Sequence, residues 1–227
     1  MTKHLFITGT GTDIGKTFVS ALIVKKLHES GARSAYYKAA MSGNDRRPDG
    51  RLIPGDAAYV QEISGIDQSL ESMCPFVYET AVSPHLASKL EGNPVSLDKV
   101  FEGLDAVDQD YDYVTSEGSG GILCPLRYDG ETILLEDVIK GRNMPCLIVA
   151  DAGLGTINDV VLTVRYMEAE KISIKGIIFN HYLPGDTMQE DNRKMVEELT
   201  GIPVVACVRK GDRDLDMDVD LLKSFYE

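Results

Sequence analysis

Hydrophobic and polar positions follow two patterns that alternate along the chain. Short apolar runs rich in β-branched or aromatic residues indicate buried strands, whereas longer segments with apolar residues at helical spacing indicate helices. The short runs predict strands at 4–8, 33–38, 111–116, 146–150, 174–179 and 203–208. The helical spacing predicts helices at 16–29, 85–91, 96–107, 156–168 and 187–199.

The alternation of strands and helices determines the expected fold. Parallel strands need crossover connections, so strands joined by helices form a mostly parallel sheet with helices on both faces. We therefore expect a doubly wound α/β fold. The 227 residues, 43% of them hydrophobic, suffice for one core, which predicts a single domain over 1–227. Ligands of such sheets bind beyond the carboxyl ends of the strands.

Three segments depart from this alternation. Residues 42–55 are rich in glycine, proline and charge, which predicts a mobile loop after the second strand. Residues 122–137 carry Asp129-Gly130 between apolar stretches, which predicts a hairpin or excursion at the sheet edge. The acidic stretch 212–220 does not match a calcium-binding loop and is interpreted as a turn that leads into a final helix.

The amino-acid composition and net charge limit the classes of ligand that we expect this protein to bind. The formal net charge is −13 and no cluster of Lys or Arg occurs, which disfavours nucleic acid and anionic membranes as partners. The first residues resemble neither a signal nor a transit peptide and no apolar run approaches ~20 residues, so we expect a soluble, cytoplasmic protein that binds a small molecule. The four cysteines are widely spaced, which favours buried thiols over zinc ligands or disulfides.

A phosphate-binding loop occupies residues 9–17, Gly-Thr-Gly-Thr-Asp-Ile-Gly-Lys-Thr, between the first strand and the first helix. Backbone N–H groups at a helix N-terminus attract phosphate, Lys16 suits β- and γ-phosphate oxygens, and the Thr17 hydroxyl suits Mg²⁺. Thr10 stands where the common pattern has its first glycine, so this loop is a lengthened variant. The competing interpretation, an incidental glycine turn, fits the strand and helix context less well.

Two acidic residues are candidate Mg²⁺ ligands, because Mg²⁺ prefers carboxylate and phosphate oxygens. Glu117 ends a predicted strand and precedes Gly-Ser-Gly-Gly, a position at the carboxyl edge of the sheet. A solvated turn glutamate is the alternative. Asp56 follows Pro54-Gly55 and opens a helical stretch, so a metal ligand and a simple N-cap are equally compatible with its position.

Lys38 ends the second predicted strand, at the same edge as Lys16. Lysine is rarely buried without an anionic partner, so two lysines at one edge suit a substrate whose negative charge increases during the reaction. A solvated lysine at the strand end is the alternative.

Six segments, in order along residues 4 to about 180, together resemble the dethiobiotin synthetase family. The matching segments are 9–17, 37–43, 55–57, 83–87, 117–121 and 153–158. The resemblance implies a P-loop NTPase-like fold and ATP- and Mg²⁺-dependent carboxylation of 7,8-diaminopelargonic acid by CO₂, with closure of the ureido ring to dethiobiotin in biotin biosynthesis. It also implies a homodimer in which the substrate carboxylate binds a helix N-terminus of the neighbouring subunit.

The resemblance assigns roles to individual residues. It implies catalytic roles for Lys16, Lys38 and Thr12, and Mg²⁺ ligands at Thr17, Asp56 and Glu117. Substrate-binding residues are implied at Ser42, Gly155, Thr156 and Asn158. Asn180 matches the position that reads adenine. The implied nucleotide-binding residues are Asp13, Ile14, Gly15, Lys16, Thr17, Phe18, Asp56, Glu117, Gly118, Gly120 and Asn180.

A second function remains open at this point. A P-loop ATPase switch of the partitioning or iron-protein type would bind nucleotide to drive association and would make no small molecule. Such loops normally carry an additional lysine near their start, and residues 9–15 contain none.

Overall fold

The computed structural model describes residues 2–227 and has a central six-stranded parallel sheet. The strand order across the sheet is β10-β9-β8-β1-β5-β2, and all five pairings are parallel. The strands are β1 (Lys3–Gly9), β2 (Ser34–Lys38), β5 (Tyr113–Glu117), β8 (Cys146–Asp151), β9 (Ile174–Asn180) and β10 (Val204–Cys207). The predicted doubly wound α/β fold is confirmed.

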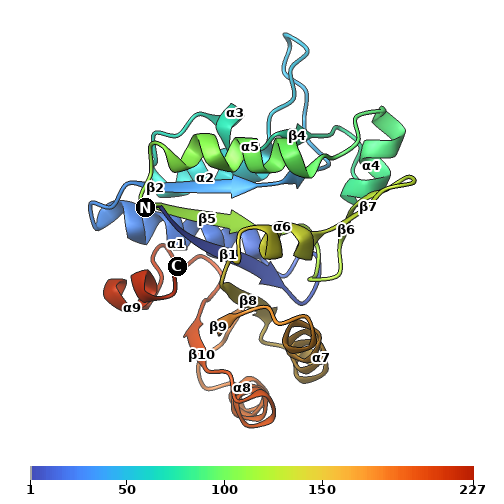
Figure 1. The fold of residues 1–227 in the computed structure, drawn as a ribbon. Helices are drawn as coiled ribbons and strands as arrows, with labels where there is room; N and C mark the ends of the chain where they lie inside the picture. Colours follow the sequence, from blue (N-terminus) through green and yellow to red (C-terminus); the bar gives the residue numbers. More distant parts are fainter. Residues whose placement is uncertain (1) are drawn as a thin grey trace.

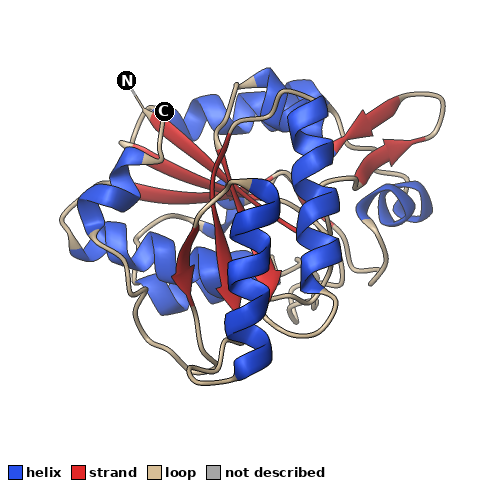
Figure 2. Ribbon diagram, turned by 90° about the horizontal axis from the view of Figure 1, so that it is seen from below, coloured by secondary structure: helices blue, strands red, loops and turns tan. Residues whose placement is uncertain are grey.

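Helices cover both faces of this sheet (Figures 1 and 2). On one face, α1 (Lys16–Glu29), α2 (Gly55–Ser64) and α9 (Val219–Ser224) pack their apolar residues against the strands. The other face is covered by α5 (Leu97–Asp108), α6 (Leu135–Gly141), α7 (Thr156–Ala169) and α8 (Thr187–Thr200). The strands are buried on both sides, which explains why they read as continuous apolar runs.

Short elements outside the central sheet complete the fold. Residues 125–134 form the predicted hairpin, β6 (Pro125–Tyr128) and β7 (Thr132–Leu134), but as a separate antiparallel sheet rather than on the edge of the central one. The chain also forms α4 (Pro84–Glu91), which was predicted within one residue. The short elements α3 (Leu70–Met73), β3 (Ala40–Met41) and β4 (Phe76–Val77) were not predicted.

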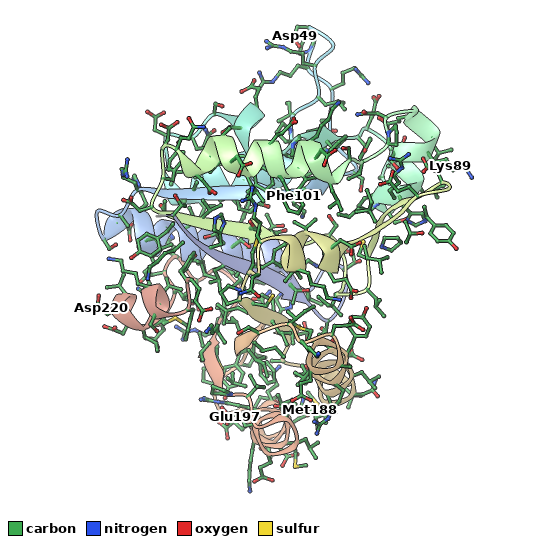
Figure 3. All side chains as sticks on the ribbon, in the orientation of Figure 1. Asp49, Lys89, Phe101, Met188, Glu197 and Asp220 are labelled. Carbon is green, nitrogen blue, oxygen red and sulfur yellow. The ribbon has the colours of Figure 1, made fainter. Side chains whose placement is uncertain are left out.

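The predicted loop at 42–55 projects from the molecule, with Asp49 near its tip (Figure 3). An isolated antiparallel bridge joins Arg46 to Leu52 across the base of this tip. The loop leads directly into α2 and so carries Asp56 to the carboxyl edge of the sheet. Among the described residues, no helix is both long enough and apolar enough to cross a membrane.

The register of the paired strands places the functional residues side by side at the carboxyl edge of the sheet. Glu117 of β5 pairs with Lys38 of β2 on one side and with Ile7 of β1 on the other. The phosphate-binding loop begins at Gly9, the last residue of β1. Three segments that are far apart in sequence therefore end side by side.

Candidate active site

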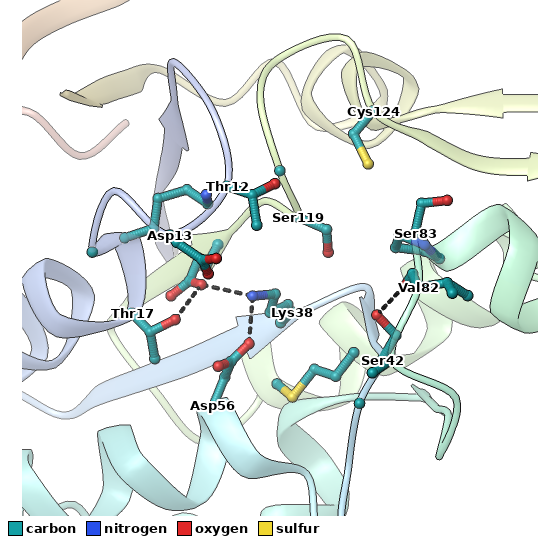
Figure 4. Close-up of a pocket in the computed structure, with 18 residues that line it drawn as sticks. Thr12, Asp13, Thr17, Lys38, Ser42, Asp56, Val82, Ser83, Ser119 and Cys124 are labelled. Atoms are coloured by element: carbon teal, nitrogen blue, oxygen red, sulfur yellow. Dashed lines mark hydrogen bonds and ion pairs between the residues drawn. The ribbon is translucent and has the colours of Figure 1, made fainter. Parts of the chain in front are cut away.

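A cleft of about 850 Å³ opens at the carboxyl edge of the sheet, where β1, β2 and β5 end. Loops from four parts of the chain enclose it, with polar groups on the side of α1 and α2 (Figure 4). Its lining residues are Thr12, Asp13, Gly15, Lys16, Thr17, Lys38, Met41, Ser42, Gly43, Asp56, Ala81, Val82, Ser83, Pro84, Glu117, Ser119, Gly120 and Cys124.

The phosphate-binding loop presents the N-terminus of α1 to this cleft. Gly15 precedes the helix with a φ of 89°, in the left-handed region that favours glycine. The Lys16 ammonium folds back over the loop and donates to the Gly11 carbonyl at 2.7 Å. Burial lowers the pKa of Lys16, although Glu117 opposes this effect. The loop thus combines free helical N–H groups with one cation, as an anion site requires.

Lys38 is the centre of an ionic cluster in which Lys38 and Glu117 are buried and Asp56 is partly exposed. Its ammonium contacts Asp56 Oδ2 at 2.6 Å and Glu117 Oε1 at 2.7 Å, and Thr17 Oγ1 donates to Glu117 Oε1 at 2.8 Å. Burial by itself would lower the pKa of Lys38, but Glu117 and Asp56 outweigh it and raise that pKa. Lys38 is therefore charged at every physiological pH.

The cluster decides between the alternatives that the sequence left open. Lys38 is 6% exposed and Glu117 is 1% exposed, so the solvated alternatives for both are wrong. Pro54 is the N-cap of α2, whereas Asp56 lies in its first turn, so the N-cap interpretation of Asp56 is also wrong. Burial favours protonation of Asp56, but Lys38, the Thr17 hydroxyl and Lys16 together outweigh it and lower the pKa of that carboxyl.

The residues present fit a magnesium ion that is shared with a phosphate. The described part of the chain has no group of three or more His, Cys, Asp and Glu side chains that could hold a metal alone. Asp56, Glu117 and the Thr17 hydroxyl instead supply oxygen atoms around one ammonium group. Mg²⁺ typically takes one or two carboxylates and completes its shell with phosphate oxygens and water.

One polar contact of Glu117 was not predicted. The hydroxyl of Tyr36 donates to Glu117 Oε2 at 3.1 Å from beneath the cleft. Strand alternation was the available signal, because side chains at positions i and i+2 share a face and Tyr36 is two residues before Lys38.

Two further predicted residues, Ser42 and Thr12, line other parts of the cleft. Ser42 lines it, with its hydroxyl donating to the Val82 carbonyl at 2.6 Å. Thr12 lies across from Ser42, together with Ser119 (Figure 4). No cleft role was predicted for Met41, Ser119, Cys124 or segment 81–84, although Met41, Ser119 and residues 83–84 belong to matched segments. Burial raises the pKa of the Cys124 thiol, against the effect of Lys16 and Lys38.

Other predicted residues lie outside this cleft. Asn180, at the end of β9, is buried and donates to the Ile14 carbonyl at 2.9 Å, so it contacts the back of the phosphate-binding loop. Its Oδ1 atom is buried without a hydrogen-bond partner. Ile14 and Phe18 pack against an apolar cluster under the sheet, and Gly118 lies against Leu135 and Phe6, so these three residues likewise do not line the cleft within residues 2–227.

The residues predicted to bind the substrate tail of a neighbouring subunit do not line the cleft of their own chain within residues 2–227. Gly155 is the N-cap of α7 with a φ of 96°, Thr156 is buried and Asn158 is exposed in the first turn. They follow β8, which lies on the opposite side of β1 from β5 and β2. The neighbouring Leu154 is 92% exposed.

Comparison with known proteins identifies relatives along the full length. A family model described as an AAA domain matches residues 3–213. The ATP-dependent dethiobiotin synthetase BioD of Clostridium botulinum (strain Loch Maree / Type A3) is 44% identical over 227 residues, which cover 100% of this chain and 99% of that protein. The protein of the same description from Brachyspira hyodysenteriae is 45% identical over 217 residues, covering 95% of this chain and 96% of that protein.

Solved structures with this fold include more distant P-loop proteins. The MinC:MinD cell division complex of Aquifex aeolicus matches with a TM-score of 0.57 and 14% identity, covering 98% of this chain and 86% of that one. A ParA family ATPase from Chlorobium tepidum matches with a TM-score of 0.55 and 13% identity, covering 93% of this chain and 84% of that one. These likenesses confirm the P-loop NTPase fold, and the far closer sequence relatives show that the chain belongs to the ATP-dependent dethiobiotin synthetase family.

Proposed function

We propose that the protein carboxylates 7,8-diaminopelargonic acid with CO₂ and closes the ureido ring of dethiobiotin at the expense of ATP. In this reaction one amine captures CO₂ as a carbamate, and a carbamate oxygen attacks the γ-phosphorus with loss of ADP. The second amine then attacks the carbonyl carbon of the mixed anhydride, which forms the second C–N bond, releases phosphate and closes the ring. The observation that carries the proposal is the convergence of Lys16, Lys38 and two carboxylates on one cleft in a chain of this family.

The two lysines stabilise the negative charges of different reactants. Lys16 and the N–H groups of α1 hold β- and γ-phosphate oxygens. Lys38 faces the same cleft and stabilises the carbamate, which must approach the triphosphate although both are anions. Thr12 and Ser42 line the cleft at positions suited to bind the diamine and its carbamate.

We assign Mg²⁺ to Thr17, Asp56 and Glu117, and ATP to the loop from Asp13 to Phe18. When bound, the metal neutralises phosphate charge and orients the γ-phosphate for in-line attack. Gly118 and Gly120 lie in the loop that follows β5, and we assign them to the nucleotide side of the site.

Asn180 is our candidate for reading the adenine base. Its unpartnered Oδ1 atom can accept a hydrogen bond from an exocyclic amine, while its amide nitrogen holds the Ile14 carbonyl. An acceptor that is buried without a donor in the free protein gains most from a ligand that supplies one.

For the substrate tail, we propose a homodimer in which Gly155, Thr156 and Asn158 of one subunit bind the carboxylate at the cleft of the other. Free N–H groups at the start of α7 suit an anion, and the exposed side chains of Leu154 and Leu162 give this surface an apolar character. A cytoplasmic location and one catalytic domain over 1–227 remain part of this proposal.

The test is the substrate dependence of ATP hydrolysis by the purified protein. We expect ADP release to require both diaminopelargonic acid and bicarbonate, with dethiobiotin formed in equal amount. Lys38→Ala should lower kcat about 10²–10³-fold, because its charge acts on the transition state. A high ATPase rate without either substrate would contradict the proposal and favour the switch function, for which only distant fold likeness speaks.

A further inference from the structure

Tyr36 lies beneath the cleft rather than in it. Its side chain is fully buried and packs among apolar residues of α1 and α2. The tyrosine is not among the cleft-lining residues, yet its hydroxyl reaches Glu117 Oε2 at 3.1 Å. Any influence of Tyr36 on the reaction must therefore act through Glu117.

The contacts of Glu117 separate its two carboxylate oxygens. Oε1 accepts from the Thr17 hydroxyl and the Lys38 ammonium, both of which line the cleft. Oε2 accepts from Tyr36. The last torsion of a glutamate has a broad distribution, so packing alone restrains the plane of the carboxylate weakly. A fixed donor on the oxygen that faces away from the cleft restrains this plane and so holds the other oxygen toward the cleft.

The backbone of Tyr36 is itself held in place. Strand β2 is at the edge of the sheet, and within residues 2–227 no strand pairs with its outer side. The side-chain amide of Gln68 fills this position: its Oε1 accepts from the Tyr36 N–H at 2.8 Å and its Nε2 donates to the Tyr36 carbonyl at 3.0 Å. Gln68 is buried, so these two hydrogen bonds to the Tyr36 backbone are shielded from water.

We propose that Tyr36 is a positioning residue whose hydroxyl fixes the Glu117 carboxylate for metal binding. This inference rests on the proposed function, in which Glu117 is a metal ligand. Outer hydrogen-bond partners of metal ligands orient those ligands and contribute to metal affinity.

The adjacent residue provides a matched control. Tyr37 is equally buried, points to the other face of β2, and donates its hydroxyl to the Val100 carbonyl at 2.7 Å. Tyr36→Phe and Tyr37→Phe therefore each remove one buried hydroxyl from the same strand. Only the former removes a donor from Glu117.

The experiment measures Mn²⁺ binding in the presence of ADP by electron paramagnetic resonance, for the wild-type protein and three variants. We expect Tyr36→Phe to raise the Kd for Mn²⁺ about tenfold, within the range found for outer partners of metal ligands. Tyr37→Phe should stay within about twofold of wild type, since its hydroxyl has no contact with the cluster. Glu117→Gln should weaken Mn²⁺ binding at least as much as Tyr36→Phe. Thermal unfolding of each variant measures the stability change separately.

Equal Mn²⁺ affinities for the two Phe variants would overturn the positioning role. If Glu117→Gln still weakens binding in that case, the metal assignment of the proposed function stands and only the inference about Tyr36 fails. An unchanged Mn²⁺ affinity in Glu117→Gln would overturn both.

Discussion

At the scale of single residues, the active site depends on one lysine between two carboxylates. Lys38 is buried, and its attraction to Asp56 and Glu117 offsets the cost of removing the charge from water. With Lys16 included, the four charges cancel. A divalent cation therefore makes the cluster net positive, which suits two anionic reactants.

The lowered pKa of the Asp56 carboxyl leads us to expect that the stability of the fold depends on pH. Burial favours its protonated form, but Lys38, with the Thr17 hydroxyl and Lys16, outweighs this and holds its folded-state pKa below the ordinary value of 3.8. A carboxyl whose pKa is lowered on folding stabilises the protein above its unfolded pKa and loses that effect as the pH falls through the folded pKa.

The test compares wild type with Asp56→Asn by urea unfolding across pH. We expect the difference in unfolding free energy to be constant from about pH 7 to pH 5 and to shrink below about pH 4, where the carboxyl takes up protons. A difference that stays constant into the acid range would show that the ion pair of Asp56 with Lys38 does not stabilise the fold.

Much of the polar cluster could be predicted from single residues, and part could not. Lys16, Lys38 and Glu117 each stand at the end of a predicted strand or loop, and parallel topology brings such ends together. Strand alternation places Tyr36 on the same face as Lys38, but the sequence does not show that the Tyr36 hydroxyl contacts a carboxylate 81 residues away.

At the scale of elements, the phosphate-binding loop is shaped by its close contact with β9. An added Cβ on Gly15 would lie 2.0 Å from Asn180 Nδ2, and Gly15 has a φ of 89°. Gly11, in the same loop, has nothing within 4 Å of an added Cβ. The two glycines of this loop therefore differ in whether the structure has room for a side chain at their position.

We predict that Gly15→Ala weakens ADP binding more than tenfold and lowers the unfolding free energy by about 1–3 kcal/mol, from left-handed strain and displacement of Asn180. Gly11→Ala should change both quantities far less. Calorimetric titration with ADP and urea unfolding measure the two effects, and similar losses in both variants would contradict the argument from contact with Asn180.

The elements that the sequence predicted well are those with strong internal patterns. Helix α1 was predicted with its observed bounds, and α7 within one residue. Strand β3 has two residues and helix α3 has four, which is too few for a hydrophobic periodicity to be recognised. These elements form because neighbouring segments pack on them. Helix α6 was missed because its seven residues follow the hairpin without a break and were read as part of it.

At the scale of the whole molecule, strand order decides which residues share a site. The order places β1 between β8 and β5, so the ends of β1, β5 and β2 meet in the cleft while the loop after β8 lies on the other side of β1. Sequence pattern predicted the parallel sheet but gave no strand order. The separation of Gly155, Thr156 and Asn158 from the cleft therefore appears only in the three-dimensional structure, and it is consistent with the tail site in a second subunit that the family resemblance implies.

A mixing experiment tests whether the active site is shared between subunits. Lys38→Ala removes a cation from the cleft, and Asn158→Asp places a negative charge at the start of α7, where it repels the substrate carboxylate; each variant alone should be nearly inactive. In a mixed dimer with shared sites, one site combines both altered residues and the other combines both normal ones. Random mixing makes half of the dimers mixed, so we expect activity to recover to about a quarter of wild type after subunit exchange. If Lys38 and Asn158 acted in the same chain, no dimer would contain an intact site, and the absence of recovery in a mixture shown to exchange subunits would exclude the shared site.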